Sequence, residues 1–161
     1  VRLKPLFAPN HNPEMEIMKQ MAKAKDRIDF AIFTFSESSG IDDLMNVVVN
    51  TGIKISGLVN GDSRNSSWNA IHNLDPQVDF EFTKKGLNGL GKLHHKLMVI
   101  DKKVLIIGSF NYTRPANLFN DENIIVIGDL DETNTDGKTN QAIFGKYAFD
   151  EIERIRNTFT V

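Results

Sequence analysis

The chain has 161 residues, of which 40% are hydrophobic and 25% are charged, a composition typical of one soluble globular domain. It contains no cysteine, which excludes thiol catalysis, disulfides and zinc sites built on cysteine. The formal net charge of -2 excludes a strongly basic nucleic-acid coat protein, so a polyanion must meet a local basic patch. We therefore expect a single domain over residues 1–161.

The sequence leaves the compartment of the protein open. Its longest apolar runs are far too short to cross a bilayer, and we expect no stable membrane insertion. The first ten residues lack the apolar core of a signal peptide. The chain begins with Val1 rather than Met, as a mature product or a piece of a longer protein would. A soluble protein in the cytoplasm and one exported after removal of a signal both agree with this.

Strand and helix patterns alternate along the first half of the chain. A short strand over residues 2–7 precedes a helix that is capped by Asn12. The largely apolar runs over residues 27–36 and 53–60 predict strands that are covered on both faces. A helix that is ended by Gly52 separates these two strands.

The second half of the chain predicts further strands and one long helix. A short helix over residues 66–74 and a short strand over residues 78–82 precede two apolar strands that flank Asp101. Another apolar strand covers residues 123–128, and residues 139–159 form an amphipathic helix. This alternation indicates an α/β fold in which helices sandwich a mixed β-sheet, with the antiparallel part around Asp101.

Polar side chains interrupt the two apolar strands that flank Asp101. A two-residue turn between these strands would place His94 opposite Asn111. The same pairing would place Lys96 opposite Ser109, on the same face of the sheet. Because an unpaired buried polar group costs about 1–3 kcal/mol, several of them in one hairpin indicate a ligand. A cation, two neutral donors and an imidazole suit the oxygens of a phosphate.

These positions match a known signature without a gap. The pattern H-x-K-x4-D-x6-G-S-x-N resembles the HKD motif of the phospholipase D superfamily, on His94, Lys96, Asp101, Gly108, Ser109 and Asn111. The stretch "IDFAIFTFS" resembles the first structural unit of that superfamily. The stretch "NDEN" resembles the segment with its acidic partner, which would be Glu122. The resemblance covers most of the chain and implies a phospholipase D-like fold.

The resemblance implies covalent catalysis, and we expect no cofactor. His94 would attack phosphorus and form a phosphohistidine, which water or an alcohol then resolves. Lys96 and Asn111 would bind the nonbridging oxygens as phosphorus becomes five-coordinate. Ser109 would orient the phosphate or His94. Glu122 would hold the other imidazole nitrogen and fix the tautomer.

Two motif positions and one neighbouring histidine are assigned to structure. Asp101 suits the turn, because its carboxylate can accept nearby backbone N–H groups. Gly108 would allow a close approach of the backbone. His95 lies on the opposite face of its strand from His94, and we expect it to be a packed or structural histidine.

A local basic rim is expected beside the motif. Lys92 and Arg114 are candidate substrate-binding residues, because they lie close to the motif in the sequence. Lys84 and Lys85 would extend this rim, although each cation alone is more often an ordinary surface charge. Trp68 could stack on a base, but core packing is the better expectation for it.

Metal and dinucleotide sites are the main alternative chemistries. The acidic segment over residues 128–137 fails the spacing of a calcium loop. No pair of carboxylates or histidines with ligand spacing surrounds His94, which favours catalysis without a metal. The glycine-rich segment over residues 86–91 leads into a strand rather than a helix, so it is no dinucleotide fingerprint. That segment is either a mobile lip of the site or a plain loop.

The implied chemistry needs a second histidine that protonates the leaving oxygen. His11 and His72 lie in unrelated contexts, so the sequence holds one motif only. The resemblance to small single-motif nucleases implies a homodimer, with His94 of both chains facing one phosphate at the two-fold axis. The sequence also resembles the C-terminal half of longer two-motif members, in which the missing half would supply the second histidine.

We interpret the chain as a metal-independent phosphodiesterase, with nucleic acid as the substrate of a nonspecific endonuclease. The nuclease hypothesis rests on the small size, the single motif and the basic rim, and it is an analogy. One alternative is a phospholipid hydrolase or phosphatidyltransferase of the phospholipase D type, which would need an exposed apolar entrance. Another alternative is a non-catalytic nucleic-acid-binding domain, against which the intact motif argues.

Overall fold

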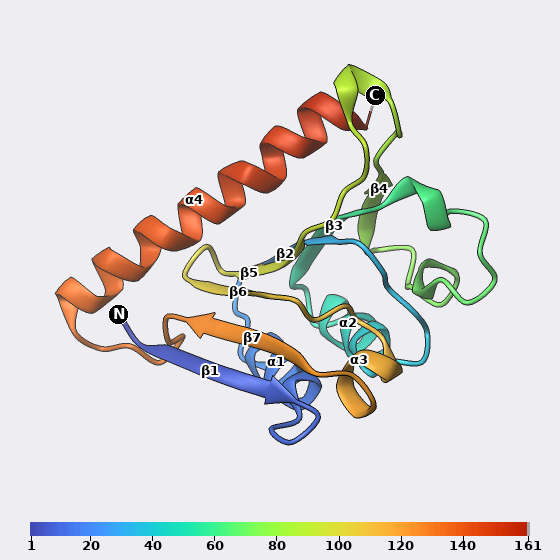
Figure 1. Cartoon of the computed structure of the whole chain (residues 1–161). Helices are drawn as coiled ribbons and strands as arrows, with labels where there is room; N and C mark the ends of the chain where they lie inside the picture. The colour runs from blue at the N-terminus through green and yellow to red at the C-terminus, as the bar shows by residue number, and fades with distance from the viewer. Residues whose placement is uncertain (161) are drawn as a thin grey trace.

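A seven-stranded mixed sheet forms the centre of the computed structural model, which describes residues 1–160 (Figure 1). The strands lie side by side in the order β1-β7-β6-β5-β2-β3-β4. Strands β2, β3 and β4 are parallel to one another, and the other neighbouring pairs are antiparallel. Their bounds are β1 Leu3–Ala8, β2 Arg27–Ile32, β3 Lys54–Val59, β4 Asp79–Phe82, β5 Lys96–Ile100, β6 Val104–Gly108 and β7 Glu122–Ile127.

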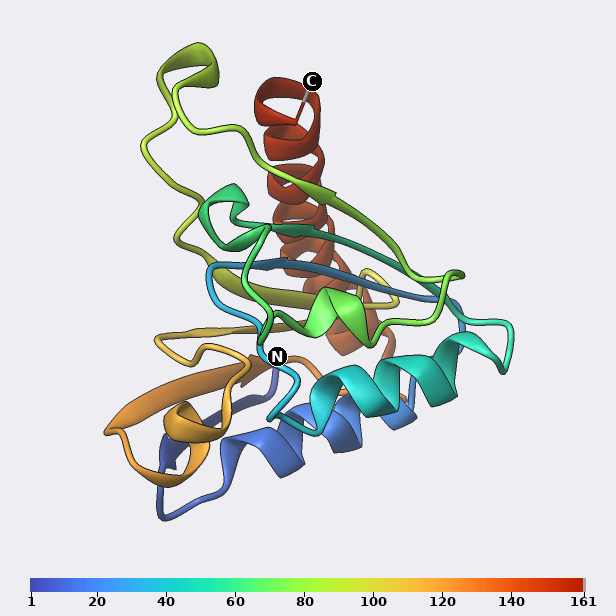
Figure 2. The ribbon, with the colours of Figure 1, turned by 90° about the vertical axis from the view of Figure 1, so that its right-hand side faces the viewer.

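Helices cover both faces of this sheet, which confirms the predicted α/β sandwich (Figure 2). Helices α1 and α2 lie on one face, and the 25-residue α4 crosses the other. As predicted, the side chain of Asn12 caps α1, where it accepts the N–H of Met15. The bounds are α1 Pro13–Ala22, α2 Ile41–Val49, α3 Arg114–Leu118 and α4 Thr135–Phe159, with short 3-10 turns at Gly61–Ser63, Ala70–His72 and Leu87–Gly89.

Alternation along β5 divides the hydrophobic core into two layers. Met98 and Ile100 point toward the face covered by α1 and α2, and both are fully buried there. Leu97 and Val99 point toward the opposite face and pack with Ile152 of α4. Strand β5 is therefore covered on both faces, at the middle of the sheet.

On the face of the sheet that α4 crosses, strands β6, β7 and β1 are only partly covered. Ile107 of β6 and Ile125 of β7 lie side by side in register, and both are exposed. Leu3 of β1 is exposed as well. The first half of α4 also exposes apolar side chains, and Tyr147 there is 80% exposed. A cavity of about 580 Å³ lies between α4 and strands β5 to β7, and it reaches His94.

The pairing of β5 with β6 differs by one residue from the predicted pairing. Ile100 faces Val104 across residues 101–103, so the expected two-residue turn is wrong. Asp101 stays outside the ladder because its N–H donates to the Arg27 carbonyl at 2.8 Å and its φ is +54°. The expected cross-strand pairs of polar side chains are therefore wrong as well.

Four local expectations are also corrected. The strand predicted to run to residue 36 ends at Ile32, and residues 66–74 form only a single 3-10 turn. Helix α3 lies where a loop was expected, because the Thr113 side chain accepts the Ala116 N–H and caps it. Trp68, which was expected in the core, is 43% exposed.

Candidate active site

His94 lies in a short segment that leads into β5 and is fixed on both sides. The backbone N–H of Leu93 donates to Oδ1 of the buried Asn60 at 3.1 Å. The carbonyl of His95 accepts the N–H of Phe33 at 2.9 Å. Asn60 and Phe33 directly follow β3 and β2, so these bonds place His94 where both strands end.

The ring of Phe33 forms a platform for the basic groups of the motif. The imidazole of His94 lies 4.6 Å from this ring, centroid to centroid. The ammonium groups of Lys96 and Lys92 lie 5.0 Å and 5.6 Å from the ring centroid. An aromatic face attracts cations, so Phe33 gathers two positive charges beside His94.

Lys96 also contacts His94 directly. Its Nζ donates to the His94 carbonyl at 2.9 Å and lies 3.2 Å from each of the two ring nitrogens. Partial desolvation lowers the pKa of His94, and the charges of Lys96, Lys92 and His95 lower it further. A lowered pKa keeps the imidazole neutral over a wider pH range, and the neutral form is the nucleophile.

Asn111 is held near the aromatic platform by a bond to Thr34, the residue after Phe33. Its Oδ1 accepts the N–H of Thr34 at 3.1 Å, and the Thr34 carbonyl accepts the N–H of Tyr112. Because the amide oxygen is used in this bond, the NH2 group is the part of Asn111 that can donate to an anion. Residues that are distant in the sequence thus meet at the end of β2.

Ser109 and Glu122 form a hydrogen-bonded pair. The Ser109 hydroxyl donates to Oε2 of Glu122 and accepts the N–H of Asn123 at 3.0 Å. Within residues 1–160, the expected bond from Glu122 to the ring of His94 is not formed. Desolvation lowers the pKa of Lys96. The negative charge of Glu122 acts on Lys96 instead and opposes this shift without reversing it.

Asp101 and Gly108 have structural positions. The carboxylate of Asp101 accepts three successive backbone N–H groups of residues 25–27, each at 2.9 Å. These donors come from the segment that enters β2, and not from the turn as expected. A Cβ atom on Gly108 would lie 2.1 Å from the carbonyl oxygen of Asn123, so the approach of β6 to β7 requires glycine.

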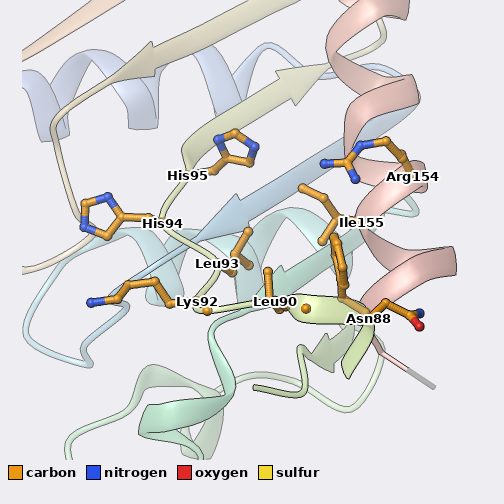
Figure 3. A pocket seen from close by; sticks show the side chains of 11 residues that line it. Asn88, Leu90, Lys92, Leu93, His94, His95, Arg154 and Ile155 are labelled. Carbon is orange, nitrogen blue, oxygen red and sulfur yellow. The ribbon is translucent and has the colours of Figure 1, made fainter. Parts of the chain in front are cut away.

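His95 points toward α4 and away from His94 (Figure 3). Its Nε2 lies 3.0 Å from Glu151, which also accepts two bonds from Arg154 at 2.7 and 2.8 Å. The bonds from Arg154, which have the largest effect, and the bond from His95 lower the pKa of Glu151 to about 2. His95 is therefore bonded to α4, and it is half exposed rather than packed as expected.

The other cations of the predicted rim are only partly gathered at the site. Lys92 lies at the aromatic platform. Arg114 begins α3, and its backbone N–H donates to Ser38 at 3.3 Å, in the loop that follows β2. Lys84 lies in the segment before the motif, and its N–H donates to the carbonyl of Phe159 at 2.8 Å. No bond joins Arg114 or Lys84 to His94 within residues 1–160.

Reasoning from the sequence missed Phe33, Thr34 and Asn60 as parts of the site. Phe33 and Thr34 belong to a run whose apolar character predicts core packing. The available signal for Asn60 is its position, since it is a polar residue directly after a buried strand that lies beside β2. Its role depends on a contact 33 residues away along the chain, which spacing alone does not reveal.

Two hollows meet at His94. The first is the cavity of about 580 Å³ beside β6 and β7. The second has a volume of about 510 Å³ and lies between residues 88–93 and the last turns of α4 (Figure 3). His94 and His95 line both hollows, so a group that is bound at His94 has room on either side.

Among residues 1–160, no cluster of three or more histidine, cysteine, aspartate or glutamate side chains is placed to hold a metal ion. In the same described part of the chain, no helix has the length and apolarity that spanning a membrane requires. The groups around His94 are ammonium and amide donors, and such donors bind the oxygens of a phosphate.

Comparison with known families agrees with this arrangement. A family model described as "Cardiolipin synthase, PLD-like domain" matches residues 17–139. This match covers more than half of the chain. The chain therefore belongs to the phospholipase D-like family, a family of phosphodiesterases.

Curated relatives carry related names. Phospholipase D of Rickettsia conorii is 30% identical over 124 residues, which make up 76% of this chain and 60% of that protein. The mitochondrial cardiolipin hydrolase of Chlamydomonas reinhardtii is 27% identical in an alignment of 130 residues, gaps included, that covers 74% of this chain and 53% of that protein. The chain thus spans between half and two thirds of the length of these relatives.

Solved structures share the whole fold. NucT from Helicobacter pylori superposes with a TM-score of 0.80 at 18% identity, over 99% of this chain and 98% of that chain. The phospholipase D family member Nuc from Salmonella typhimurium gives a TM-score of 0.80 at 15% identity, over 98% and 95% of the two chains. These likenesses confirm the phospholipase D-like fold that the motif implied.

Proposed function

We propose that the chain is a metal-independent phosphodiesterase that works through a covalent phosphohistidine on His94. The observation that carries this proposal is the arrangement of His94, Lys96 and Asn111 around residues 33–34. It combines a neutral imidazole, an ammonium group and an amide donor in one place. These are the groups that an attack on phosphorus needs.

The reaction proceeds in two steps. A ring nitrogen of His94 attacks phosphorus, so that a P–N bond forms and the P–O bond to the leaving group breaks. A second, protonated histidine gives its proton to the leaving oxygen. The same histidine then takes a proton from water, whose oxygen attacks phosphorus and breaks the P–N bond. Lys96 and the NH2 group of Asn111 hold the nonbridging oxygens in both steps.

The second histidine is His94 of another copy, so we propose a homodimer with the active site at its two-fold axis. The bare part of the α4 face supports this proposal. Ile107, Ile125 and Tyr147 expose apolar surface around the cavity that reaches His94. If the first half of α4 of each copy covers the bare strands of the other, the two copies bury these surfaces and bring their histidines together.

We assign nucleic acid as the substrate, cleaved as by a nonspecific endonuclease. Lys92 supplies a cation at the aromatic platform beyond the one that Lys96 provides for the reacting phosphate. A polymer with successive phosphates makes use of such an additional charge. Contacts to phosphates carry no sequence information, so this arrangement predicts cleavage without base preference.

A phospholipid substrate is the second candidate, and one observation favours it. Leu97, Leu105 and Ile125 line the cavity that reaches His94, and an acyl chain would fit such a lining. The names of the curated relatives, phospholipase D and mitochondrial cardiolipin hydrolase, point in the same direction. The two candidates give this cavity different occupants, which are the helix of a second copy and an acyl chain.

The test of the catalytic proposal uses the parent chain and His94→Ala with excess EDTA. A plasmid and a labelled oligonucleotide are offered in parallel with phospholipid vesicles. We expect cleavage of the nucleic acids by the parent alone, and a phosphate ester on His94 in rapidly quenched samples by mass spectrometry. Loss of activity with EDTA would contradict the mechanism. Cleavage of the vesicles alone would assign the second candidate.

The homodimer is tested by sedimentation velocity. Ile125→Lys places a charge on the bare strands, and we expect it to convert a dimeric parent into an inactive monomer. Leu118→Lys is the matched control, because Leu118 is an exposed apolar residue of α3 outside this surface. A parent that is monomeric and fully active would refute the shared active site.

A further inference from the structure

The hollow between residues 88–93 and α4 begins at His94, and its other lining residues take no part in the bond-making steps. Its volume of about 510 Å³ suits a group of the size of one nucleoside, since ligand pockets begin at about 300 Å³. The bonds of Glu151 to His95 and Arg154 separate this hollow from the cavity beside β6 and β7. The exposed residues of the bare strands, Ile107 and Ile125, line the cavity beside β6 and β7 and do not line this hollow.

The hollow has an apolar floor and a cation on either side. Leu93 and Ile155 are buried in the floor, and Phe159 lines it at the end of α4. Figure 3 shows Lys92 beside His94 on one side, and Arg154 on the other side, on α4. An apolar floor between two cations matches a flat ring that is joined to phosphates.

The wall opposite α4 is fixed to the end of that helix. Nδ2 of Asn88 donates to the carbonyl of Thr158 at 2.7 Å. The N–H of Lys84 donates to the carbonyl of Phe159 at 2.8 Å. The hollow is thus preformed, and a ligand does not have to order its wall on binding.

Arg154 is held in one orientation at the rim. Its Nε and one NH2 nitrogen donate to the two carboxylate oxygens of Glu151. Its Cζ atom lies 5.6 Å from the centroid of the Phe159 ring. The side chain is nevertheless 55% exposed, so the guanidinium plane remains accessible to a ligand. Guanidinium planes are surfaces on which unpaired bases stack.

We propose that this hollow binds the nucleoside next to the cleaved phosphate, with its base against Arg154 and the following phosphate at Lys92. The proposal rests on the nucleic-acid cleavage proposed above. A base enters the hollow only after it leaves its stack, so we expect single strands to be cleaved faster than the stacked strands of a duplex. An acyl chain fits poorly here, because Lys92, His95 and Arg154 surround the apolar floor with polar groups.

The experiment compares two substrates that share the reaction and differ in the neighbouring group. An oligonucleotide of abasic units offers the diester alone, without bases, and a single-stranded oligonucleotide with bases adds the neighbouring nucleosides. For Arg154→Gln, we expect the ratio of turnover with bases to turnover without bases, each as kcat/KM, to fall about tenfold. Arg2→Gln is the matched control, since Arg2 is an exposed arginine that pairs with Asp129. We expect that variant to keep the ratio of the parent.

A binding measurement separates this proposal from the proposed function. Fluorescence anisotropy with a labelled oligonucleotide reports the subsite even where cleavage fails, and we expect about tenfold weaker binding by Arg154→Gln. Equal losses on both substrates, or unchanged anisotropy, would overturn the subsite while leaving the phosphodiesterase intact. A variant that loses turnover on phospholipid vesicles instead of oligonucleotides would assign the hollow to a lipid head group and overturn the nucleoside proposal.

Discussion

The two ends of the β5–β6 hairpin use their polar side chains in opposite ways. At the turn, the carboxylate of Asp101 accepts three backbone N–H groups of residues 25–27 and fastens the hairpin to β2. At the other end, His94 and Lys96 contact each other and the ring of Phe33. The same motif therefore contains a part that builds the fold and a part that is free to meet a ligand.

The largest expected effect is a loss of activity at the open end of the hairpin, the end with His94 and Lys96, without a change of the fold. His94→Ala removes the nucleophile, and we expect diester turnover to fall by at least about 10³-fold. Because His94 is exposed, the midpoint of thermal unfolding should stay within about 2 °C of the parent. Turnover assays and thermal unfolding of the same samples check both statements. A large loss of stability would show that His94 belongs to the structural part.

The opposite pattern is expected at the turn. Asp101→Ala leaves three N–H groups without their acceptor, and we expect the free energy of unfolding to fall by about 1–3 kcal/mol. Urea unfolding measures this change. Turnover per folded molecule should remain near that of the parent at low temperature. Inactive protein of unchanged stability would mean that Asp101 takes part in the chemistry.

Phe33 tests the comparison of the two hairpin ends further, because it follows β2 and lies near the cations at the open end. Phe33→Leu removes the aromatic face near Lys96 and Lys92, and we expect kcat/KM to fall about tenfold. Phe149→Leu is a matched control, since the Phe149 ring lies near the cations of Arg27 and Lys102 instead. Equal losses in both variants would reduce the role of Phe33 to general packing.

The smallest expected effect concerns the pKa of His94. The charge of Lys92 is one of the causes that lower this pKa, so Lys92→Gln should raise it toward the ordinary histidine value. With a higher pKa, the imidazole becomes protonated at a higher pH on acidification. The acid limb of the pH–rate profile should then move to higher pH. Titration of the imidazole resonances by NMR checks the direction, and a shift to lower pH would contradict it.

Much of the fold follows from local patterns in the sequence. The apolar run of β2, the cap at Asn12 and the amphipathic pattern of α4 each depend on neighbouring residues, and all three elements are present. The pairing of β5 with β6 was not predictable, because the conformation of Asp101 is set by N–H groups that lie about 75 residues away. Turn length read from the sequence alone does not include such a contact.

The candidate site, like the fold, has a part that local sequence predicts and a part that depends on tertiary contacts. The motif spacing predicts His94, Lys96 and Asn111, because the proposed chemistry needs a nucleophile, a cation and an amide donor. It does not identify Phe33, since an aromatic residue at the end of an apolar strand resembles any core residue. The bond from Ser109 to Glu122 depends on how β6 meets β7 after Gly108, and therefore on tertiary structure.

The end of α4 has a consequence for protein engineering. The last carbonyls of a helix usually lack partners inside the protein, and helix ends fray for that reason. Here Asn88 and Lys84 bond the carbonyls of Thr158 and Phe159, so fraying of this end and opening of the hollow beside His94 form one equilibrium. A truncation of α4 before Thr158 would remove both carbonyl acceptors and shift this equilibrium toward the open state. A tag before Val1 starts at a distant point of the molecule and leaves it unchanged (Figure 1).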